Sequence, residues 1–365
     1  MRILHLAKYY WPRSGGMERV VQSLAEGSAS LGHDVQVVAV QSLGGPRPRR
    51  GKSSVTRVFS FGQLGAQEIA PGYITGVWKR ADIIHVHHPH PLADLAYLLR
   101  PGSAPVVVTH HNDSWRSIYQ PVSRIVLGRA SSIILPSSTH LALSRELRGF
   151  EATTEVVPYG IDESRWLDVP PPTADGIPRA LFIGRLVAWK GVDILLRALE
   201  RVPDLHLDVI GTGPEASRLR TLAQALAVAD RVRWFGAYPD EDLPRRMAES
   251  NFLVLPSTTA QELFGLVVLE AMASGRPVIT TAVPTAVREV NVPGETGLEV
   301  PLRDVGALAE AMRTLAADPL LCARLGAAGR VRVRRQYGQA LMVDRHLMLY
   351  DRVRGMVSDD RVPLP

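Results

Sequence analysis

Residues 252–272 read FLVLPSTTAQELFGLVVLEAM, and this stretch indicates both the fold class and the region that carries the chemistry. Its first four residues are a short apolar run typical of a buried strand, and a helical pattern begins near Gly265. A helix start presents unpaired backbone N–H groups and the positive end of the helix dipole, so it favours a diphosphate. Glycine has no Cβ and lets a ligand approach the backbone closely. Glu262 precedes the helix start and Glu270 lies more than one turn inside it, so two carboxylates flank the expected phosphate site.

Short apolar runs alternate with longer helical patterns along the rest of the chain, which is typical of βαβ units around a parallel sheet. In the first half we expect helices at 17–31 and 92–99, and strands at 3–7, 35–40, 55–60, 83–87, 106–109, 133–136 and 155–158. In the second half we expect helices at 192–199 and 266–274, and strands at 180–183, 207–210, 232–235, 252–255 and 277–280.

A proline run at 170–172 separates the two halves, because proline can neither continue a helix nor sit centrally in a sheet. The sequence therefore predicts an α/β protein with two facing Rossmann-like, doubly wound domains, 1–168 and 169–342, joined by a linker that lets them close. A C-terminal helix at 343–365 can pack back on the first domain. Ligands of such sheets bind at the carboxyl ends of the strands, so we expect the two domains to share a cleft.

The bulk composition is that of an ordinary globular protein, with 365 residues, 46% of them hydrophobic, and a net charge of +6. No apolar run approaches the roughly 18 residues that span a bilayer. The first residues do not predict a secretion signal, and Cys322 is the only cysteine, so a cytoplasmic location is expected. The basic residues at 47–57 form either a solvated loop or a contact with a membrane surface or an anionic acceptor. No nucleic-acid motif accompanies them.

The spacing of Glu262 and Glu270 around Phe264 and Gly265 resembles the signature of the family-4 retaining glycosyltransferases, which have the GT-B fold. The resemblance implies that Glu262 lies at the donor sugar and that Glu270 binds the ribose hydroxyls. It also places the backbone amides of Phe264, Gly265 and Leu266 at the diphosphate or the sugar. The alternative is an ordinary helix whose two acidic residues are solvated.

A second motif, IGRLVAWKG at 183–191, follows the first strand of the second half. The family uses the matching arginine and lysine, here Arg185 and Lys190, to stabilise the departing nucleoside diphosphate. Fixed cations serve this purpose because the leaving group gains negative charge in the transition state. Taken alone, two basic residues near a strand end are more often surface charge.

The paired glycines Gly15 and Gly16 stand between the first strand and the first helix, where a tight turn can bring amides to a phosphate or an acceptor. The alternative is a plain strand-to-helix turn. In similar enzymes this loop lies over the phosphates of the donor.

The residues Thr109, His110 and His111 match the Thr-x-His pattern that the family often shows at a strand end. The resemblance places His111 at a hydroxyl of the transferred sugar, with Asp113 as a lesser candidate. His110 should point elsewhere if the alternation of the strand persists.

Three other motifs suggest different chemistry. The run HVHHPH at 85–90 invites a metal site, but no carboxylate or cysteine spacing accompanies it, so structural histidines or histidines at the edge of the substrate site are favoured. The turn at 211–216 resembles an incomplete dinucleotide fingerprint, and we interpret Gly211 as a border of the nucleotide pocket. The acidic residues at 240–242 fit a helix start. We expect no metal and no cofactor.

The motifs are most similar to those of bacterial mannosyltransferases of surface polysaccharide assembly. The expected reaction is transfer of a hexosyl unit from GDP-mannose, or alternatively from a UDP-hexose, to a saccharide or lipid-linked acceptor. No positioned nucleophile is evident, which favours front-face substitution. Leu263, Thr285 and Ala286 depart from the family pattern and can reshape the sugar pocket.

A lipid-linked acceptor would place the enzyme at the inner face of the cytoplasmic membrane, with Tyr9, Tyr10 and Trp11 near the lipid. Two competing functions remain, an NAD(P)-dependent oxidoreductase and a non-catalytic protein that binds nucleotide sugars.

Overall fold

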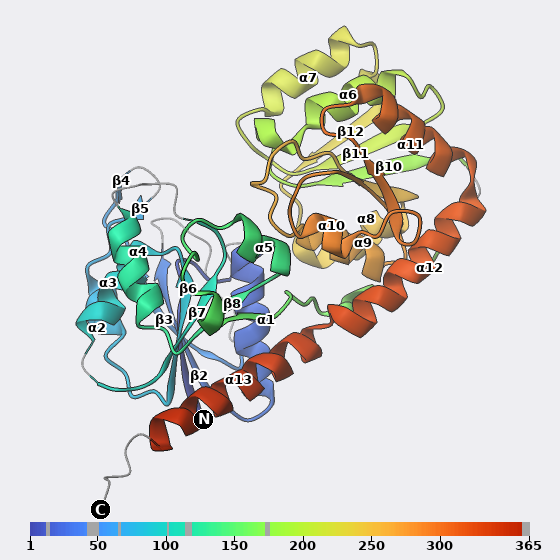
Figure 1. Ribbon diagram of the computed structural model, residues 1–365. Helices are drawn as coiled ribbons and strands as arrows, with labels where there is room; N and C mark the ends of the chain where they lie inside the picture. Colours follow the sequence, from blue (N-terminus) through green and yellow to red (C-terminus); the bar gives the residue numbers. More distant parts are fainter. Residues whose placement is uncertain are drawn as a thin grey trace, which may run out of the picture. The chain divides into compact units, whose positions relative to one another are not determined.

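The computed structural model describes residues 1–11, 15–41, 51–64, 67–100, 102–113, 119–171 and 176–359. The chain divides into two compact units (Figure 1). The first unit contains Met1–Gly160 together with the C-terminal residues from Gln339 on, and the second contains Ile161–Gly338. Within the described residues, no helix is both long and apolar enough to cross a bilayer.

The first unit is built on a parallel sheet of seven strands in the order β3-β2-β1-β6-β7-β8-β9. The strands are β1 (Arg2–Leu6), β2 (Asp34–Gln41), β3 (Ser54–Phe59), β6 (Ile83–His88), β7 (Val106–His110), β8 (Ser132–Leu135) and β9 (Thr154–Val156). A small antiparallel hairpin pairs β4 (Gln63–Leu64) with β5 (Gln67–Glu68). The strand order reverses between β1 and β6, as in a doubly wound fold.

Helices cover the sheet of the first unit: α1 (Gly16–Ser30), α2 (Gly72–Gly76), α3 (Pro91–Leu99), α4 (Gln120–Gly128), α5 (Ser138–Leu143) and α13 (Gln339–Asp359). Buried residues of α2, α3 and α4 form one core with alternate residues of the strands, such as Leu4, Val86 and Val108. The long C-terminal helix α13 packs against α1 (Figure 1). The side chains alternate along each strand, so each face of the sheet buries its own apolar set.

The second unit contains a six-stranded parallel sheet in the order β12-β11-β10-β13-β14-β15. Its strands are β10 (Arg179–Ile183), β11 (His206–Ile210), β12 (Val232–Gly236), β13 (Phe252–Leu255), β14 (Val278–Thr281) and β15 (Gly297–Val300). Its helices are α6 (Val192–Glu200), α7 (Ala216–Ala225), α8 (Leu243–Ala248), α9 (Leu266–Ala273), α10 (Val287–Val290), α11 (Val305–Ala317) and α12 (Pro319–Gln336). Here the strand order reverses between β10 and β13.

The strands expected from the apolar runs are all present, whereas β15 and the helices α11 and α12 were not assigned from the sequence. The unit boundaries also differ from the expected 168/169 and 342/343, since the chain enters the second unit at Ile161 and leaves it after Gly338. The segment that contains Trp166 explains the first difference, because Trp166 is only 1% exposed and residues 163–166 pack against α9 of the second unit. The carbonyl of Val169 is held in turn by Arg330 at 3.1 Å. Residues 172–175 of the expected linker lie outside the described residues.

Candidate active site

The loops that follow β10 and β13 lie side by side, because these neighbouring strands are the pair at which the strand order reverses. The carbonyl oxygen of Trp189 in the first loop accepts a hydrogen bond from the backbone N–H of Thr258 in the second loop, at 2.8 Å. The hydroxyl of Thr258 donates to the same carbonyl at 3.2 Å. Two segments that are far apart in the sequence therefore meet at the carboxyl ends of two central strands.

Lys190 and Glu262 form a buried ion pair between these two loops. The Nζ atom of Lys190 donates to Oε2 of Glu262, and the hydroxyl of Ser257 donates to the same oxygen at 2.8 Å. Lys190 is 9% exposed and Glu262 is 7% exposed. Because a buried charge needs a partner, the two side chains hold each other in place, and the loss of one leaves the other uncompensated.

Thr285 and Ala286, which depart from the family pattern, support the loop that carries Glu262. The hydroxyl of Thr285 donates to the backbone carbonyl of Glu262 at 2.7 Å, and the backbone N–H of Ala286 donates to the carbonyl of Leu263 at 3.0 Å. Thr285 is 1% exposed. These two residues therefore fix the backbone on which Glu262 stands.

Gly265 caps the N-terminus of α9 in a left-handed conformation, with φ at 73°. A residue with a Cβ is disfavoured at this φ, which explains the glycine at the start of the helix. Phe264 and Glu270 are both buried, whereas Leu266 at the first helical position is half-buried. The structure therefore has a glycine-capped helix start at the expected position, and the anion site at this helix start stays a prediction.

Arg185 lies on the loop after β10, but it does not join the Lys190–Glu262 pair. Its side chain is exposed, and among the residues that the structure describes its guanidinium has no hydrogen-bond or ion-pair partner. An arginine in this state can turn to an incoming anion without first breaking an internal contact.

Gly211 packs its backbone directly against the loop that carries Arg185. A Cβ at this position would lie 1.8 Å from the carbonyl oxygen of Gly184, and φ of Gly211 is 139°. The requirement for glycine is therefore explained by contact between two strand ends, independently of any nucleotide.

Gly211→Ala is expected to lower the free energy of unfolding of the second unit by about 3 kcal/mol, because the backbone must move to admit the Cβ. Gly294→Ala is the matched control, since Gly294 also has a positive φ but has no atom within 4 Å of its Cβ position. Urea denaturation of both variants measures the difference, and equal losses would contradict the proposed clash.

His111 lies just beyond β7 and is bonded at both ring nitrogens. Its Nδ1 lies 2.5 Å from the hydroxyl of Tyr159, and its Nε2 lies 3.1 Å from Nδ1 of His87. Burial, followed by the neighbouring histidines, lowers the pKa of His111 to about 3, so the ring is neutral near pH 7. A sugar hydroxyl that contacts this ring must replace one of its two present partners.

The histidine run at 85–90 does not form a single site, because strand alternation sends its members to opposite faces. His85 and His87 stack with their ring centroids 4.3 Å apart, and Nε2 of His87 lies 3.1 Å from Nδ1 of His5. His88 faces the other side, where its ring stacks on that of His110 at 5.4 Å. His110 therefore points away from His111, as the alternation predicted.

His88 and His110 contact residues that the sequence did not single out. Nδ1 of His88 lies 3.1 Å from Asp94, and Nε2 of both histidines approaches Glu146. Although burial alone would lower it, hydrogen bonds with Asp94 and Glu146 raise the pKa of His88 to about 9. Nothing in the local sequence around Glu146 signals this contact, because only the fold brings it to the strand ends.

The glycine turn of the first unit begins α1, with Gly15 as its N-cap and Gly16 as its first residue. The backbone N–H of Arg19 donates to the carbonyl of Gly15 at 3.1 Å, which closes the first turn. Ser14 lies outside the described residues. The acidic residues Asp240–Asp242 form a short turn before α8, as expected for acids at a helix start.

The tyrosines that were expected near a membrane are instead buried. Tyr9 is 8% exposed and donates to Glu68 at 2.9 Å, and Tyr10 is 5% exposed and donates to Glu26 at 3.1 Å. Both hydroxyls are hydrogen-bonded inside the first unit, so the expectation that these tyrosines lie near a membrane was wrong. Of the basic stretch, residues 47–50 lie outside the described residues. The guanidinium of Arg57 donates a hydrogen bond to the carbonyl of Trp11 at 2.5 Å.

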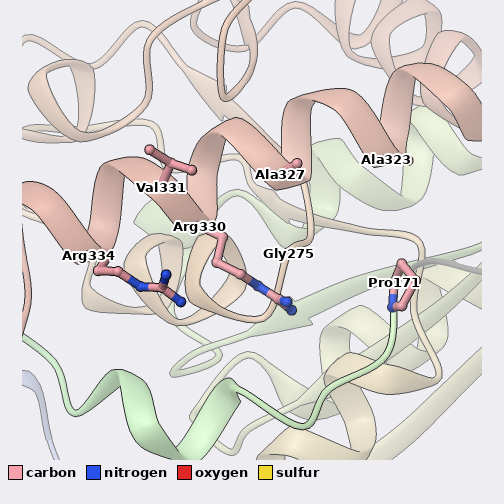
Figure 2. Close-up of a pocket in the computed structure, with 7 residues that line it drawn as sticks. All are labelled: Pro171, Gly275, Ala323, Ala327, Arg330, Val331 and Arg334. Carbon is pink, nitrogen blue, oxygen red and sulfur yellow. The ribbon is translucent and has the colours of Figure 1, made fainter.

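A recess of about 280 Å³ lies along α12 in the second unit (Figure 2). Figure 2 shows Arg330 and Arg334 on the same side of this helix, with Gly275 and Pro171 beyond them. Arg330 is held by the carbonyls of Ala273 and Val169 at 3.1 Å each. None of the predicted site residues lines this recess.

Comparisons with known proteins cover nearly the whole chain. Residues 169–332 match the family model described as glycosyl transferases group 1, and residues 14–165 match the one described as glycosyltransferase family 4. The D-rhamnosyltransferase WbpZ of Pseudomonas aeruginosa is 31% identical, with 92% of each chain covered. The O-antigen chain mannosyltransferase C of Escherichia coli is 28% identical, with 96% of this chain and 98% of that protein covered. The structure of sucrose-phosphate synthase from Thermosynechococcus elongatus is similar in fold, with a TM-score of 0.82, 24% identity, and 97% and 99% of the two chains covered.

Proposed function

This chain belongs to glycosyltransferase family 4, a retaining family of hexosyltransferases, and we propose that it transfers mannose from GDP-mannose to a saccharide or lipid-linked acceptor. The single observation that best supports the site is the buried Lys190–Glu262 pair beside the glycine-capped start of α9. It brings a cation, a carboxylate and the first backbone amides of α9 together at the carboxyl ends of β10 and β13. These are the groups that bind a nucleotide sugar.

In this proposal each residue has a separate task. Lys190 and Arg185 bind the diphosphate, and the first amides of α9 add hydrogen bonds to it. Glu262 accepts a hydrogen bond from a sugar hydroxyl, Glu270 accepts from the ribose, and neutral His111 contacts a hydroxyl of the transferred sugar. Gly15 and Gly16 supply amides to the phosphates, while Gly211 shapes the border of the pocket.

The proposed chemistry is front-face substitution at the anomeric carbon. The bond to the phosphate oxygen breaks while the acceptor hydroxyl attacks from the same face, and the leaving oxygen takes the acceptor proton. Lys190 favours this step because the negative charge that it faces grows as the bond breaks. The chain's remaining task is to orient the sugar and to exclude water.

The donor is tested by thermal shift with GDP-mannose, GDP-activated D-rhamnose and UDP-glucose. D-rhamnose is included because the relative from Pseudomonas aeruginosa is a D-rhamnosyltransferase. A donor present at a hundredfold excess over its Kd stabilises the folded state by about 2.7 kcal/mol, and at equal concentrations the donor with the lowest Kd should give the largest rise in Tm. A larger shift with UDP-glucose or with GDP-activated D-rhamnose than with GDP-mannose would contradict the proposed donor. Anomeric NMR of the product tests retention.

For the lipid-linked acceptor we propose that an exposed apolar patch, Phe59, Phe61 and Ile69, touches an anionic membrane. Phe59 is 67% exposed and Phe61 is 77% exposed, and the backbone N–H of Phe61 donates to the carbonyl of Ile69 at 2.9 Å, so the patch is continuous there. Aromatic side chains favour the membrane interface, and the basic stretch that follows β2 in sequence adds attraction to anionic lipid.

Phe61→Ser is expected to weaken binding to anionic liposomes about tenfold, because it removes one of the larger apolar contacts with the interface. Leu320→Ser is the control, since Leu320 is 82% exposed but lies in the second unit. Co-sedimentation at low and high salt measures both variants. Failure of the wild-type protein to bind at low salt would exclude the membrane part of the proposal.

A further inference from the structure

Two imidazoles and a carboxylate from three separate segments converge in the interior of the first unit. His88 ends β6 and His110 ends β7, and the two residues are register partners across these strands. Glu146 comes from the turn after α5. The exposed fractions are 0% for both histidines and 4% for Glu146. One ligand atom from each residue lies within 4.8 Å of the other two.

Both histidines present the same ring nitrogen to the same carboxylate. Nε2 of His110 lies 3.3 Å from Oε2 of Glu146, and Nε2 of His88 lies 3.4 Å from that oxygen. The opposite nitrogens are held from behind: Nδ1 of His88 lies 3.1 Å from Asp94, and Nδ1 of His110 lies 2.9 Å from His140. Histidines that bind metals are oriented in this way, with the second ring nitrogen donating to an outer partner.

The two Nε2–Oε2 distances are those of long hydrogen bonds, and they also match the spacing of ligand atoms around a tetrahedral metal. A hydrogen bond between an imidazolium and a carboxylate is usually about 2.7–2.9 Å long, shorter than either distance here. Ligand atoms at about 2.0–2.1 Å from a tetrahedral zinc ion lie roughly 3.3 Å from one another. We propose that the first unit binds one divalent transition-metal cation of the Zn²⁺ type through His88 Nε2, His110 Nε2 and the carboxylate of Glu146.

Asp113 is a further carboxylate close to these ligands. Its Oδ1 lies 3.6 Å from Nε2 of His110 and accepts from the hydroxyl of Ser144, while its Oδ2 accepts from the backbone N–H of Arg145 at 2.9 Å. The hydroxyl of Ser123 lies 3.0 Å from Nε2 of His88 and must turn aside when that nitrogen binds the cation. Two histidines with one or two carboxylates form a ligand set that suits zinc.

The second histidine cluster of this unit, His5, His85 and His87, lacks these features. Both ring nitrogens of His85 are hydrogen-bonded to hydroxyls, that of Tyr350 at 2.5 Å and that of Thr109 at 2.6 Å, whereas His88 and His110 both face a carboxylate. Among the residues that the structure describes, no carboxylate joins the group of His5, His85 and His87. The contrast makes the proposal specific to one face of the sheet.

The cation would link the ends of β6 and β7 and the turn after α5, next to His111, the proposed contact to the sugar. The backbone N–H of His111 donates to the carbonyl of His88 at 2.9 Å, so the backbone of a proposed ligand directly supports His111. The expected role is structural, with the metal holding the ends of β6 and β7 to the turn after α5.

The test uses the full-length protein after treatment with EDTA. Titration with Zn²⁺ in a calorimeter should give one equivalent per chain and a rise in Tm, and Co²⁺ should give the intense visible bands of a tetrahedral site. Absence of saturable Zn²⁺ binding by the folded wild-type protein, or an octahedral Co²⁺ spectrum, would overturn the proposal. Because this readout needs no variant, it remains valid if a substitution fails to fold.

Variants then assign the ligands. His110→Gln and Glu146→Gln should weaken Zn²⁺ binding about 100-fold or more, and Asp94→Asn should weaken it about 10–100-fold through the outer contact. His346→Gln is the control, because His346 is a buried histidine of the same unit that is not part of the site. Unchanged affinity in folded His110→Gln would show that the cation binds elsewhere and would refute the assignment.

Discussion

Lys190→Ala is expected to lower kcat/KM by about 10²–10³-fold and the free energy of unfolding by about 3–5 kcal/mol. The activity falls because the leaving diphosphate loses a fixed cation. The stability falls for a different reason, namely that Glu262 remains 7% exposed with no countercharge from Lys190. Steady-state kinetics and urea denaturation measure the two effects separately.

A double-mutant cycle distinguishes a catalytic pair from two independent residues. Glu262→Ala alone should also inactivate the enzyme, but the double variant should be more stable than the sum of the single losses by about 1–3 kcal/mol, because no unpaired charge stays buried. Arg197→Ala is the control, since Arg197 is an exposed basic residue on the helix that follows Lys190. Near-normal transfer by both single variants would remove the support for this site.

Acid is expected to unfold the first unit well before the second. Burial lowers the pKa of His5 to about 3 and that of His346 to about 4, and it lowers the pKa of His85 well below its usual value of 6.5. The three rings are neighbours: His5 lies on β1, His85 on the adjacent strand β6, and His346 on α13. The ring centroids are 5.1 Å apart for His5 and His85 and 5.7 Å apart for His85 and His346. A proton on one ring therefore disfavours a proton on the next.

Because the folded-state pKa values of these histidines are lowered, acid destabilises the first unit. Above pH 6.5 both the folded and the unfolded chain leave these histidines neutral, so the free energy of unfolding does not depend on them. As the pH falls below 6.5 the unfolded chain takes up protons that the folded unit cannot accept, and stability is lost until the folded pKa values near 3 to 4 are reached. At pH 5 each site contributes a loss of about 2 kcal/mol, and three such sites approach the total stability of a typical domain.

In the metal-free protein, His88 titrates in the opposite sense. Its pKa is raised to about 9, so the stability that it contributes is already complete below pH 6.5 and is lost only as the pH rises towards 9. The second unit contains His206 as its single histidine, between residues 161 and 338. Burial also lowers the pKa of His206, but this is one half-buried ring, so the acid sensitivity of the second unit is smaller.

Hydrogen exchange followed by mass spectrometry separates the two units. Peptides from β1 and β6 should lose protection between pH 6.5 and pH 5, while peptides from β10 and β13 keep theirs. His346→Gln should recover about 2 kcal/mol of the loss at pH 5, because one titrating site is removed. Parallel loss of protection in both units would contradict the role assigned to the buried histidines.

Sequence periodicity was sufficient for most of the fold. The apolar runs that become β10 and β13 are short and bounded by turn residues, so they could be recognised locally. β15 was missed because Gly297–Val300 contains a glycine and a glutamate and has little apolar pattern of its own. The unit boundary was misplaced because the proline run is conspicuous, whereas the burial of Trp166 depends on residues far along the chain.

The sequence also located Glu262, Lys190 and Arg185, because each stands at a strand end whose position follows from local pattern. It could not pair Lys190 with Glu262, nor show that Thr285 supports the Glu262 loop at 2.7 Å. The expectation for Tyr9 and Tyr10 failed for a related reason. Aromatic residues together with a basic stretch suggest a membrane, and only the fold shows that Glu68 and Glu26 accept hydrogen bonds from the two tyrosine hydroxyls.

The sequence by itself determined the parallel α/β architecture, the strand-end motifs and the family, because these depend on periodicity and on spacing within a few residues. Tertiary structure alone decided that His5 joins His85 and His87, and that Glu146 meets His88 and His110. The physical reason is that a strand fixes the direction of its own side chains, whereas the partner of a buried polar group is set by how distant segments pack.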